Sequence, residues 1–153
     1  MSRHSSSFSP RTGLLYVTGK NDAWSARVKP VGESLKPGAG SPGHYYENIA
    51  ETATTRMEKT QNIAAFNPAT GDLAWVTKLA ATTNGGNLVT AGDVLFQGVG
   101  RSFYALDATT GKILATVAGQ QVLSTTPLTY LAGGRQYVAI AAGNVVLAYG
   151  LPD

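Results

Sequence analysis

The sequence contains no cysteine, which excludes disulfide bonds and thiolate-ligated metal sites in this chain of 153 residues. This absence does not decide the cellular compartment, because many exported proteins also lack cysteine. Charged residues are scarce, at 14%, and no apolar run approaches the roughly 20 residues of a membrane-spanning helix. No stretch long enough for a typical helix keeps a 3.6-residue apolar period. The chain is therefore predicted to contain neither a membrane span nor a long amphipathic helix.

The net charge of +3 does not indicate a nucleic-acid partner. From residue 61 onward the chain has equal numbers of basic and acidic side chains. The excess of positive charge therefore lies in the first 60 residues, where glutamates alternate with the basic side chains. A nucleic-acid site requires a clustered basic face with aromatic platforms, and this pattern instead favours a solvated loop. Residues 1–7 are not followed by the apolar core of a signal peptide, so no cleavable signal is predicted in this chain.

An eleven-residue phrase occurs twice in the sequence. Residues 65–75 have the sequence AFNPATGDLAW and residues 105–115 have the sequence ALDATTGKILA. Aligning Gly71 with Gly111 sets the period at 40 residues, which is the length of a four-stranded propeller blade or of a helical-pair repeat. In each copy an Asn/Asp-x-x-Thr-Gly turn separates two apolar runs, and such a turn connects the two strands of a β-hairpin rather than two helices. The repeat therefore predicts a propeller blade.

The rest of the chain follows the same rhythm of short apolar runs and glycine-rich turns. The sequence predicts strands at 14–18, 62–66, 73–79, 87–91, 94–98, 102–107, 113–118, 123–128, 136–142 and 145–149. Residues 19–60 are rich in glycine and proline and are predicted to form a long excursion without strands. We therefore divide the chain into two parts of one domain. Residues 1–60 contain a partial blade strand and the long excursion, and residues 61–153 contain the propeller blades.

These strands make about two and three-quarter four-stranded antiparallel blades. Residues 8–79 are predicted to supply the last part of one blade, 85–118 a complete blade, and 122–149 three strands. Propellers typically close with four to eight blades. The predicted fold class is all-β, a partial β-propeller that needs further blades or self-association to cover its edges.

Four segments carry a resemblance to a known family. The repeated phrase resembles the tryptophan-docking motif of the eight-bladed quinoprotein alcohol dehydrogenases of the methanol and ethanol dehydrogenase type, which use pyrroloquinoline quinone (PQQ). Three further segments resemble that family in the same order: residues 7–17 (SFSPRTGLLYV), 85–98 (GGNLVTAGDVLFQG) and 127–143 (PLTYLAGGRQYVAIAAG). The resemblance covers nearly the whole chain and corresponds to the C-terminal blades of that family.

The resemblance assigns a structural role to five residues of the two copies. Trp75 is expected to lie flat between neighbouring blades and to donate its indole N–H to a carbonyl. The other docking positions that the resemblance implies are Ala65, Gly71, Ala105 and Gly111. The second copy has Ala115 where the family has tryptophan, which predicts a looser seam at that place.

The resemblance also implies cofactors, PQQ together with Ca²⁺ or a lanthanide ion. The family's metal ligands and its catalytic aspartate come from earlier blades, and no segment here matches them, so we assign no catalytic or metal-binding residue. Asn84 stands where the family often has a tryptophan near the quinone, and its amide is the main candidate for a PQQ contact, ahead of Thr82 and Thr83. Asn-Gly is also a common tight-turn dipeptide, and that alternative is favoured on sequence alone.

Taken together, the resemblance implies a C-terminal fragment of a PQQ-dependent dehydrogenase that oxidises alcohols by hydride transfer to the quinone. The fragment would contribute blades and one wall of the cofactor pocket, and would neither bind PQQ tightly nor turn over alone. The full enzyme of this family is periplasmic and passes electrons to a cytochrome c. The alternative is a non-enzymatic propeller with related repeats that acts as a protein-interaction scaffold.

Overall fold

A computed structural model describes residues 5–21, 25–30, 44–49, 60–81 and 84–150. All regular secondary structure in these ranges is β-strand, as the sequence predicted. No helix that could cross a membrane is found among them. The chain divides into two compact units, which we call the propeller unit (Met1–Asn21 and Lys59–Asp153) and the inserted unit (Asp22–Glu58).

The first sheet of the propeller unit is a complete blade. Its antiparallel strands, in spatial order, are β1 (Ser7–Ser9), β2 (Leu14–Asn21), β5 (Thr60–Phe66) and β6 (Leu73–Leu79). The prediction of only the last part of a blade was wrong, because the short strand β1 pairs with β2 through Ser7 opposite Tyr16 and Ser9 opposite Leu14. A three-residue strand next to a proline turn gives too little alternation to be recognised in the sequence.

The second sheet is the complete blade predicted for residues 85–118. Its strands are β7 (Asn87–Val89), β8 (Val94–Val99), β9 (Ser102–Asp107) and β10 (Ile113–Ala118), each antiparallel to its neighbour. The outermost strand, β10, is solvent-exposed along its whole length.

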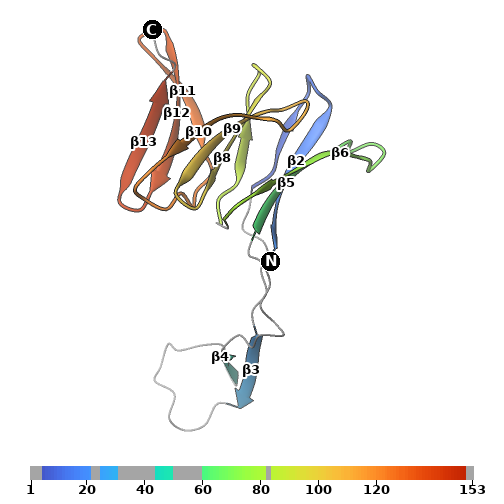
Figure 1. Cartoon of the computed structure of the whole chain (residues 1–153), viewed down its shortest axis with the longest axis vertical. Helices are drawn as coiled ribbons and strands as arrows, with labels where there is room; N and C mark the ends of the chain where they lie inside the picture. Colours follow the sequence, from blue (N-terminus) through green and yellow to red (C-terminus); the bar gives the residue numbers. More distant parts are fainter. Residues whose placement is uncertain (1–4, 22–24, 31–43, 50–59, 82–83, 151–153) are drawn as a thin grey trace. The chain divides into compact units, whose positions relative to one another are not determined.

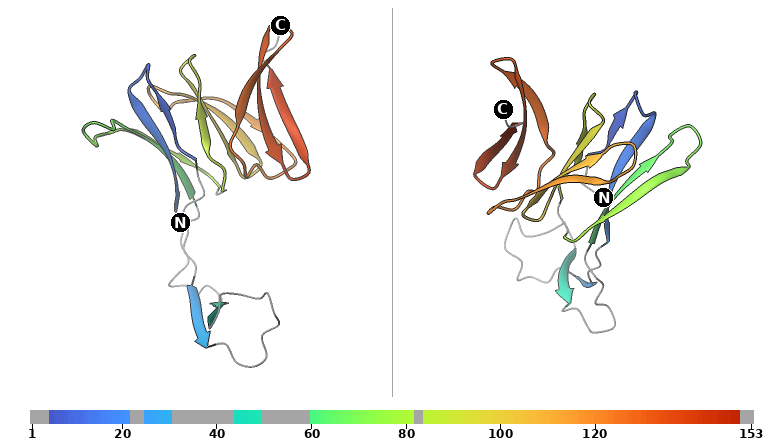
Figure 2. Two further views of the ribbon diagram at one scale, coloured as in Figure 1. Left: turned by 180° about the vertical axis from the view of Figure 1, so that it is seen from behind. Right: turned by 45° about the horizontal axis from the view of Figure 1, so that its top comes forward.

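The third sheet has three strands in the described part of the chain: β11 (Leu128–Ala132), β12 (Arg135–Ala142) and β13 (Val145–Gly150). The strand predicted at 123–128 was misplaced, since Leu123 lies outside the strand in an isolated bridge to Ala142 and the strand begins at Leu128. Pro127 has no N–H to give to a ladder, which explains the later start. Figure 1 and the two views of Figure 2 show the three sheets fanned out side by side, in agreement with the predicted partial propeller.

The inserted unit contains a hairpin that the sequence did not predict. β3 (Ser25–Pro30) pairs antiparallel with β4 (His44–Ile49), with Ser25 opposite Ile49 and Pro30 opposite His44. Residues 19–60 were predicted to lack strands because glycine and proline dominate their composition. Valine and tyrosine favour strands nonetheless, and the two segments carry Val28, Tyr45 and Tyr46.

Both copies of the repeated phrase form the predicted hairpin turn. The Asn67 side chain accepts a hydrogen bond from the Ala69 N–H at 2.9 Å, and Gly71 closes the turn at φ +79°. In the second copy the Asp107 carboxylate accepts hydrogen bonds from the hydroxyl and backbone N–H of Thr110, which hold the pKa of Asp107 below its usual value. Gly111 then adopts φ +73°, a left-handed conformation that glycine adopts without strain.

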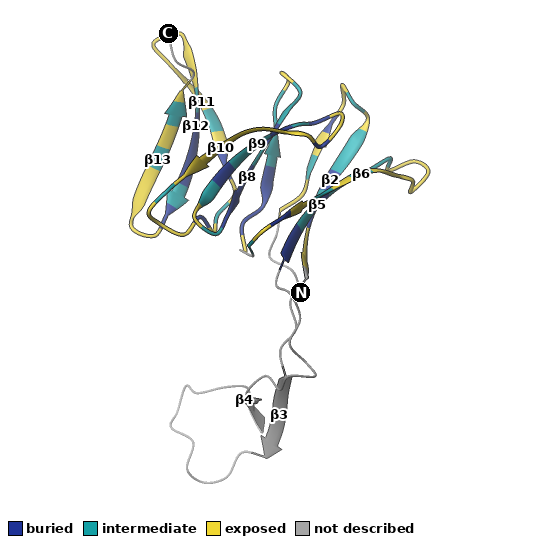
Figure 3. Cartoon of the chain, in the orientation of Figure 1, coloured by how far each residue is buried: buried dark blue, intermediate teal, exposed yellow. Residues whose placement is uncertain are grey.

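The hydrophobic core lies between the sheets rather than within one of them. One cluster joins the first two blades, with Tyr16, Ile63 and Ala65 against Leu95 and Leu106. A second cluster joins the second and third blades, where Phe103 packs with the buried residues Leu123, Val138, Ile140 and Ala142. Figure 3 shows the buried positions along β5, β8 and β12, with exposed positions along β13. Contact between blades therefore supplies most of the burial in this unit.

Candidate cofactor-facing site and the two blade seams

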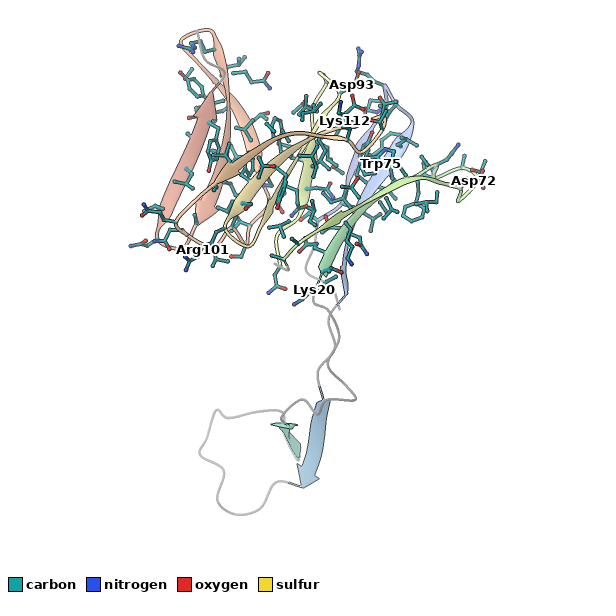
Figure 4. The ribbon with its side chains drawn as sticks, in the orientation of Figure 1. Lys20, Asp72, Trp75, Asp93, Arg101 and Lys112 are labelled. Carbon is teal, nitrogen blue, oxygen red and sulfur yellow. The ribbon has the colours of Figure 1, made fainter. Side chains whose placement is uncertain are left out.

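The first seam, between the first and second blades, is occupied by the half-buried ring of Trp75 on β6. Its Nε1–H donates a hydrogen bond to the Ala108 carbonyl at 3.1 Å, and the ring lies over Gly111 so closely that a Cβ there would overlap it. The Thr77 hydroxyl donates to the Gly111 carbonyl at 2.7 Å, two residues further along β6. Figure 4 shows Trp75 pointing from β6 toward the turn that contains Lys112. The structure thus brings Trp75 and Gly111 together across the seam.

Ala65 and Ala105 occupy the matching position on β5 and β9. Ala65 is fully buried and pairs directly with Trp75, while Ala105 pairs directly with Ala115. The sequence predicted a looser seam at Ala115, and the structure has an open apolar cavity of about 460 Å³ there, between the second and third blades. Gly71, the remaining predicted docking residue, has no neighbour within 4 Å of a built Cβ.

The segments that lead into the first strand of each blade converge at one place. The Asn87 N–H donates to the Ser5 carbonyl at 3.2 Å, and the Thr126 hydroxyl donates to the Ser5 hydroxyl at 3.1 Å. A Cβ on Gly85 would lie 2.6 Å from the Thr125 carbonyl oxygen, so this backbone approach requires glycine. Backbone groups and small polar side chains from all three blades therefore meet where these segments converge.

Asn84 lies at the edge of this convergence, directly before Gly85, and is exposed. Neither Asn84 nor Gly85 has a positive φ, so the dipeptide does not form the type I′ turn that Asn-Gly favours in hairpins. The pair belongs to the connection between two blades. The Asn84 amide remains available to a ligand at this end of the propeller unit.

A buried polar network behind this site was missed by the sequence analysis. The Asn87 amide donates to the Thr18 hydroxyl at 2.8 Å and to the Tyr16 carbonyl at 3.2 Å, and its oxygen accepts from the Ser7 hydroxyl at 2.5 Å. The Thr18 hydroxyl in turn donates to the Gln97 side-chain oxygen at 2.9 Å. The Gln97 amide donates to the Gly98 carbonyl at 2.9 Å and to the Gly85 carbonyl at 3.3 Å. The network therefore ties the first blade to the segment that carries Asn84.

The sequence did contain one signal of this network. Gln97 interrupts the apolar run of β8 and lies opposite Asn87, the first residue of β7, and both are buried. Buried amides of this kind are nearly always hydrogen-bonded. Strand pairing was needed to show that the two positions face each other.

We expect Asn87→Leu to destabilise the propeller unit by about 2–3 kcal/mol. The substitution keeps the number and branching of the side-chain heavy atoms but leaves the Tyr16 carbonyl and the Thr18 hydroxyl without the amide that now binds them. Urea unfolding followed by far-ultraviolet circular dichroism would measure the loss. Thr116→Leu, on the exposed strand β10, is the control and should change stability by less than about 0.5 kcal/mol. Equal effects of the two substitutions would contradict a structural role for the network.

The ionisable side chains in the described ranges do not form a cluster that could bind a metal ion. No group of three histidine, aspartate or glutamate residues that could hold a metal ion is found within these ranges. Arg11 and Asp93 form an exposed ion pair at 3.2 Å. Burial raises the pKa of Tyr16 above its ordinary value, although a hydrogen bond with Thr12 partly opposes this, and burial also raises the pKa of Tyr149.

Comparison with known proteins gives one consistent result. Residues 76–138 match the family described as glucose/ethanol/alcohol dehydrogenase, beta-propeller domain. The dehydrogenase subunit of alcohol dehydrogenase (quinone) from Gluconacetobacter polyoxogenes is 33% identical over 144 residues, which are 89% of this chain and 19% of that protein. Quinohemoprotein alcohol dehydrogenase from Comamonas testosteroni is 32% identical over 146 residues, 92% of this chain and 20% of that protein.

Solved structures agree with these relatives. The crystal structure of the Comamonas testosteroni enzyme superposes with a TM-score of 0.73 at 30% identity, over 92% of this chain and 22% of that one. A europium-containing methanol dehydrogenase superposes with a TM-score of 0.68 at 26% identity, over 90% of this chain and 24% of that one. The chain spans about a fifth of the length of the curated relatives that it matches.

The described sheets thus define a partial antiparallel β-propeller, with the blades adjacent and the core between them. Sequence and structure together show that the chain belongs to the PQQ β-propeller family of the quinoprotein alcohol dehydrogenases.

Proposed function

We propose that this chain forms consecutive blades, the C-terminal ones in the family's order, of a PQQ-dependent dehydrogenase that oxidises alcohols. The observation that carries the proposal is the superposition of 92% of the chain on an alcohol dehydrogenase of this family, at 30% identity. PQQ, when bound, accepts the hydride of the alcohol. This chain supplies two and three-quarter blades as a fragment of the propeller, and the rest of the ring comes from other polypeptide sequence.

The docking residues hold these blades together in the proposal. Trp75 contacts Gly111 and the Ala108 carbonyl, and these contacts support a docking role for the indole ring. Ala65 is small enough to let the ring lie against its own sheet, and Ala105 repeats this position in the next blade. Gly71 and Gly111 close the equivalent turns with left-handed φ.

Asn84 forms part of one wall of the cofactor pocket in the proposal. Its exposed amide can donate to a carboxylate of PQQ, and the Gln97 bond to Gly85 keeps the neighbouring backbone in place. The Asn84 amide suits a PQQ carboxylate, but the described residues do not supply the ligands of the metal ion that accompanies PQQ. Ca²⁺ requires six to eight oxygen ligands, and the described ranges offer no cluster of three carboxylate or imidazole groups. We therefore assign the Ca²⁺ or lanthanide ligands and the catalytic aspartate to the other blades.

The partners of the assembly follow from the same assignment. A relative from Thauera butanivorans, 32% identical over 92% of this chain, is named 1-butanol dehydrogenase (cytochrome c). We propose a cytochrome c as the electron acceptor and the periplasm as the compartment. The remaining propeller blades are the proposed partner, because the third blade leaves apolar side chains of β11 and β13 exposed, among them Leu131 and Val146.

A chimaera tests this function. The chain replaces the matching fifth of the Comamonas testosteroni enzyme, and PQQ binding and dye-linked oxidation of short alcohols are measured with Ca²⁺ present. We expect the chimaera to bind PQQ and turn over, and the 153-residue chain alone to do neither, because general-base catalysis worth roughly 10²–10⁴-fold has no described agent within it. Turnover by the chain alone, or a folded chimaera that does not bind PQQ, would contradict the proposal.

The same chimaera tests Asn84. Asn84→Ala should weaken PQQ binding by roughly tenfold to a hundredfold, the equivalent of one hydrogen bond to a charged group. Asn144→Ala is the matched control, since Asn144 is also exposed and lies in the turn between β12 and β13. Identical PQQ dissociation constants for the two variants would remove Asn84 from the pocket.

A further inference from the structure

We propose that the cavity at the second seam, next to Ala115, binds a small planar bicyclic aromatic molecule of the size of indole. The cavity lies between the second and third blades and opens to solvent. The inference does not depend on quinone chemistry, because it rests on a comparison of the two seams within this chain.

The blade before each seam presents equivalent side chains. Strand pairing shows which residues are equivalent. In the first blade Tyr16 lies opposite Ala65, and in the second blade Phe96 lies opposite Ala105. Ala65 in turn pairs with Trp75, as Ala105 pairs with Ala115. At the first seam Tyr16 and Ala65 lie beside Trp75, and Leu14 packs against the same core cluster. At the second seam the equivalents of these three residues in the cavity wall are Val94, Phe96 and Ala105.

The blade after each seam is equivalent too. Leu95 pairs with Leu106 as Val138 pairs with Tyr149. Leu95 and Leu106 belong to the buried cluster against which Trp75 packs. Val138 and Tyr149 line the cavity. The cavity thus repeats the strand positions of both blades at the Trp75 site, with a methyl group in place of the indole ring. The turn that carries Ala108 and Gly111, which the indole contacts, has no counterpart among the described residues of the third blade.

The chemistry of the walls selects the ligand. The cavity of about 460 Å³ lies in the volume range of small-molecule sites, and its apolar lining would favour an apolar guest. Phe96, Phe103 and Tyr149 form a continuous stack, with ring centroids 5.8 and 4.8 Å apart and nearly parallel planes. A planar aromatic guest can extend contacts of this kind. Gln136 and Thr90 also line the cavity, and their oxygens can accept the single N–H of an indole.

The test is thermal unfolding of the whole chain with and without indole. We expect indole at roughly ten times its Kd to raise the Tm by about 3–6 °C. Ala115→Trp should fill the cavity from within, raise the Tm by about 2–6 °C, and abolish the effect of added indole. Ala118→Trp is the matched control: it lies on the same exposed strand outside the cavity and should leave the indole effect unchanged.

Methyl NMR of the unmutated chain keeps the proposal testable if Ala115→Trp does not fold. Indole should shift the methyl resonances of Val94 and Val138, which line the cavity, and leave those of Ile63 in the first-seam core unchanged. An indole effect on Tm that persists in Ala115→Trp would overturn the proposal. Unchanged Val94 and Val138 resonances at saturating indole would overturn it as well.

Discussion

Replacing Trp75 by alanine should destabilise the propeller unit by about 3 kcal/mol. The indole ring fills the first seam and packs against a core cluster that both blades share, so its removal leaves a cavity between them. The ring is half-buried rather than fully buried, which places the expected loss at the lower end of the range for tryptophan truncations. Urea unfolding at equilibrium, followed by circular dichroism, would measure it.

Two further variants separate the causes of this loss. Trp75→Phe keeps an aromatic ring but removes the N–H that donates to the Ala108 carbonyl, and should cost about 1 kcal/mol for that hydrogen bond, in addition to the effect of the smaller ring. Val76→Ala, on the neighbouring exposed position of β6, is the control and should cost little. A loss for Trp75→Ala no larger than that for Val76→Ala would show that the seam does not depend on the indole.

Gly111→Ala is the second substitution from which we expect a large effect. Two costs combine at this position: the left-handed φ of +73° disfavours any Cβ by about 1–2 kcal/mol, and the added methyl would overlap the Trp75 ring, at about 1–3 kcal/mol more. Gly71→Ala is the control from the other copy of the repeat. Gly71 has φ +79° but nothing within 4 Å of a built Cβ, so it should show the backbone cost alone.

A double-mutant cycle isolates the contact between the two residues. In the Trp75→Ala background the overlap with the ring disappears, so Gly111→Ala should then cost about as much as Gly71→Ala. Additive losses in the cycle would mean that Gly111 and Trp75 do not interact.

The parts of the fold that the sequence predicted depend on local chemistry. The two Asn/Asp-x-x-Thr-Gly turns form as expected, because a side-chain oxygen caps the turn and glycine accepts the positive φ, all within five residues. The errors have a different origin. β1 has three residues and was not among the predicted strands, and the strand predicted at 123–128 begins at Leu128, because the apolar pattern does not show which N–H groups find a partner.

The candidate site was predictable only in part. Asn84 could be singled out because the family resemblance placed it, and the structure excludes only the type I′ form of the turn that Asn-Gly favours. The Ser7–Asn87–Thr18–Gln97 network could not be predicted, because its members are up to 90 residues apart and only the pairing of sheets places them together.

The sequence by itself determined the all-β class, the hairpin turns, the 40-residue period and the family, because these follow from local turn chemistry and apolar alternation. Only the tertiary structure decided which distant groups meet. Asn87 binds Thr18 and Tyr16 of another blade, and the Ser5 carbonyl accepts from the Asn87 N–H. The packing of one sheet on the next brings these groups together, and their separation along the chain hides the contact from any local pattern.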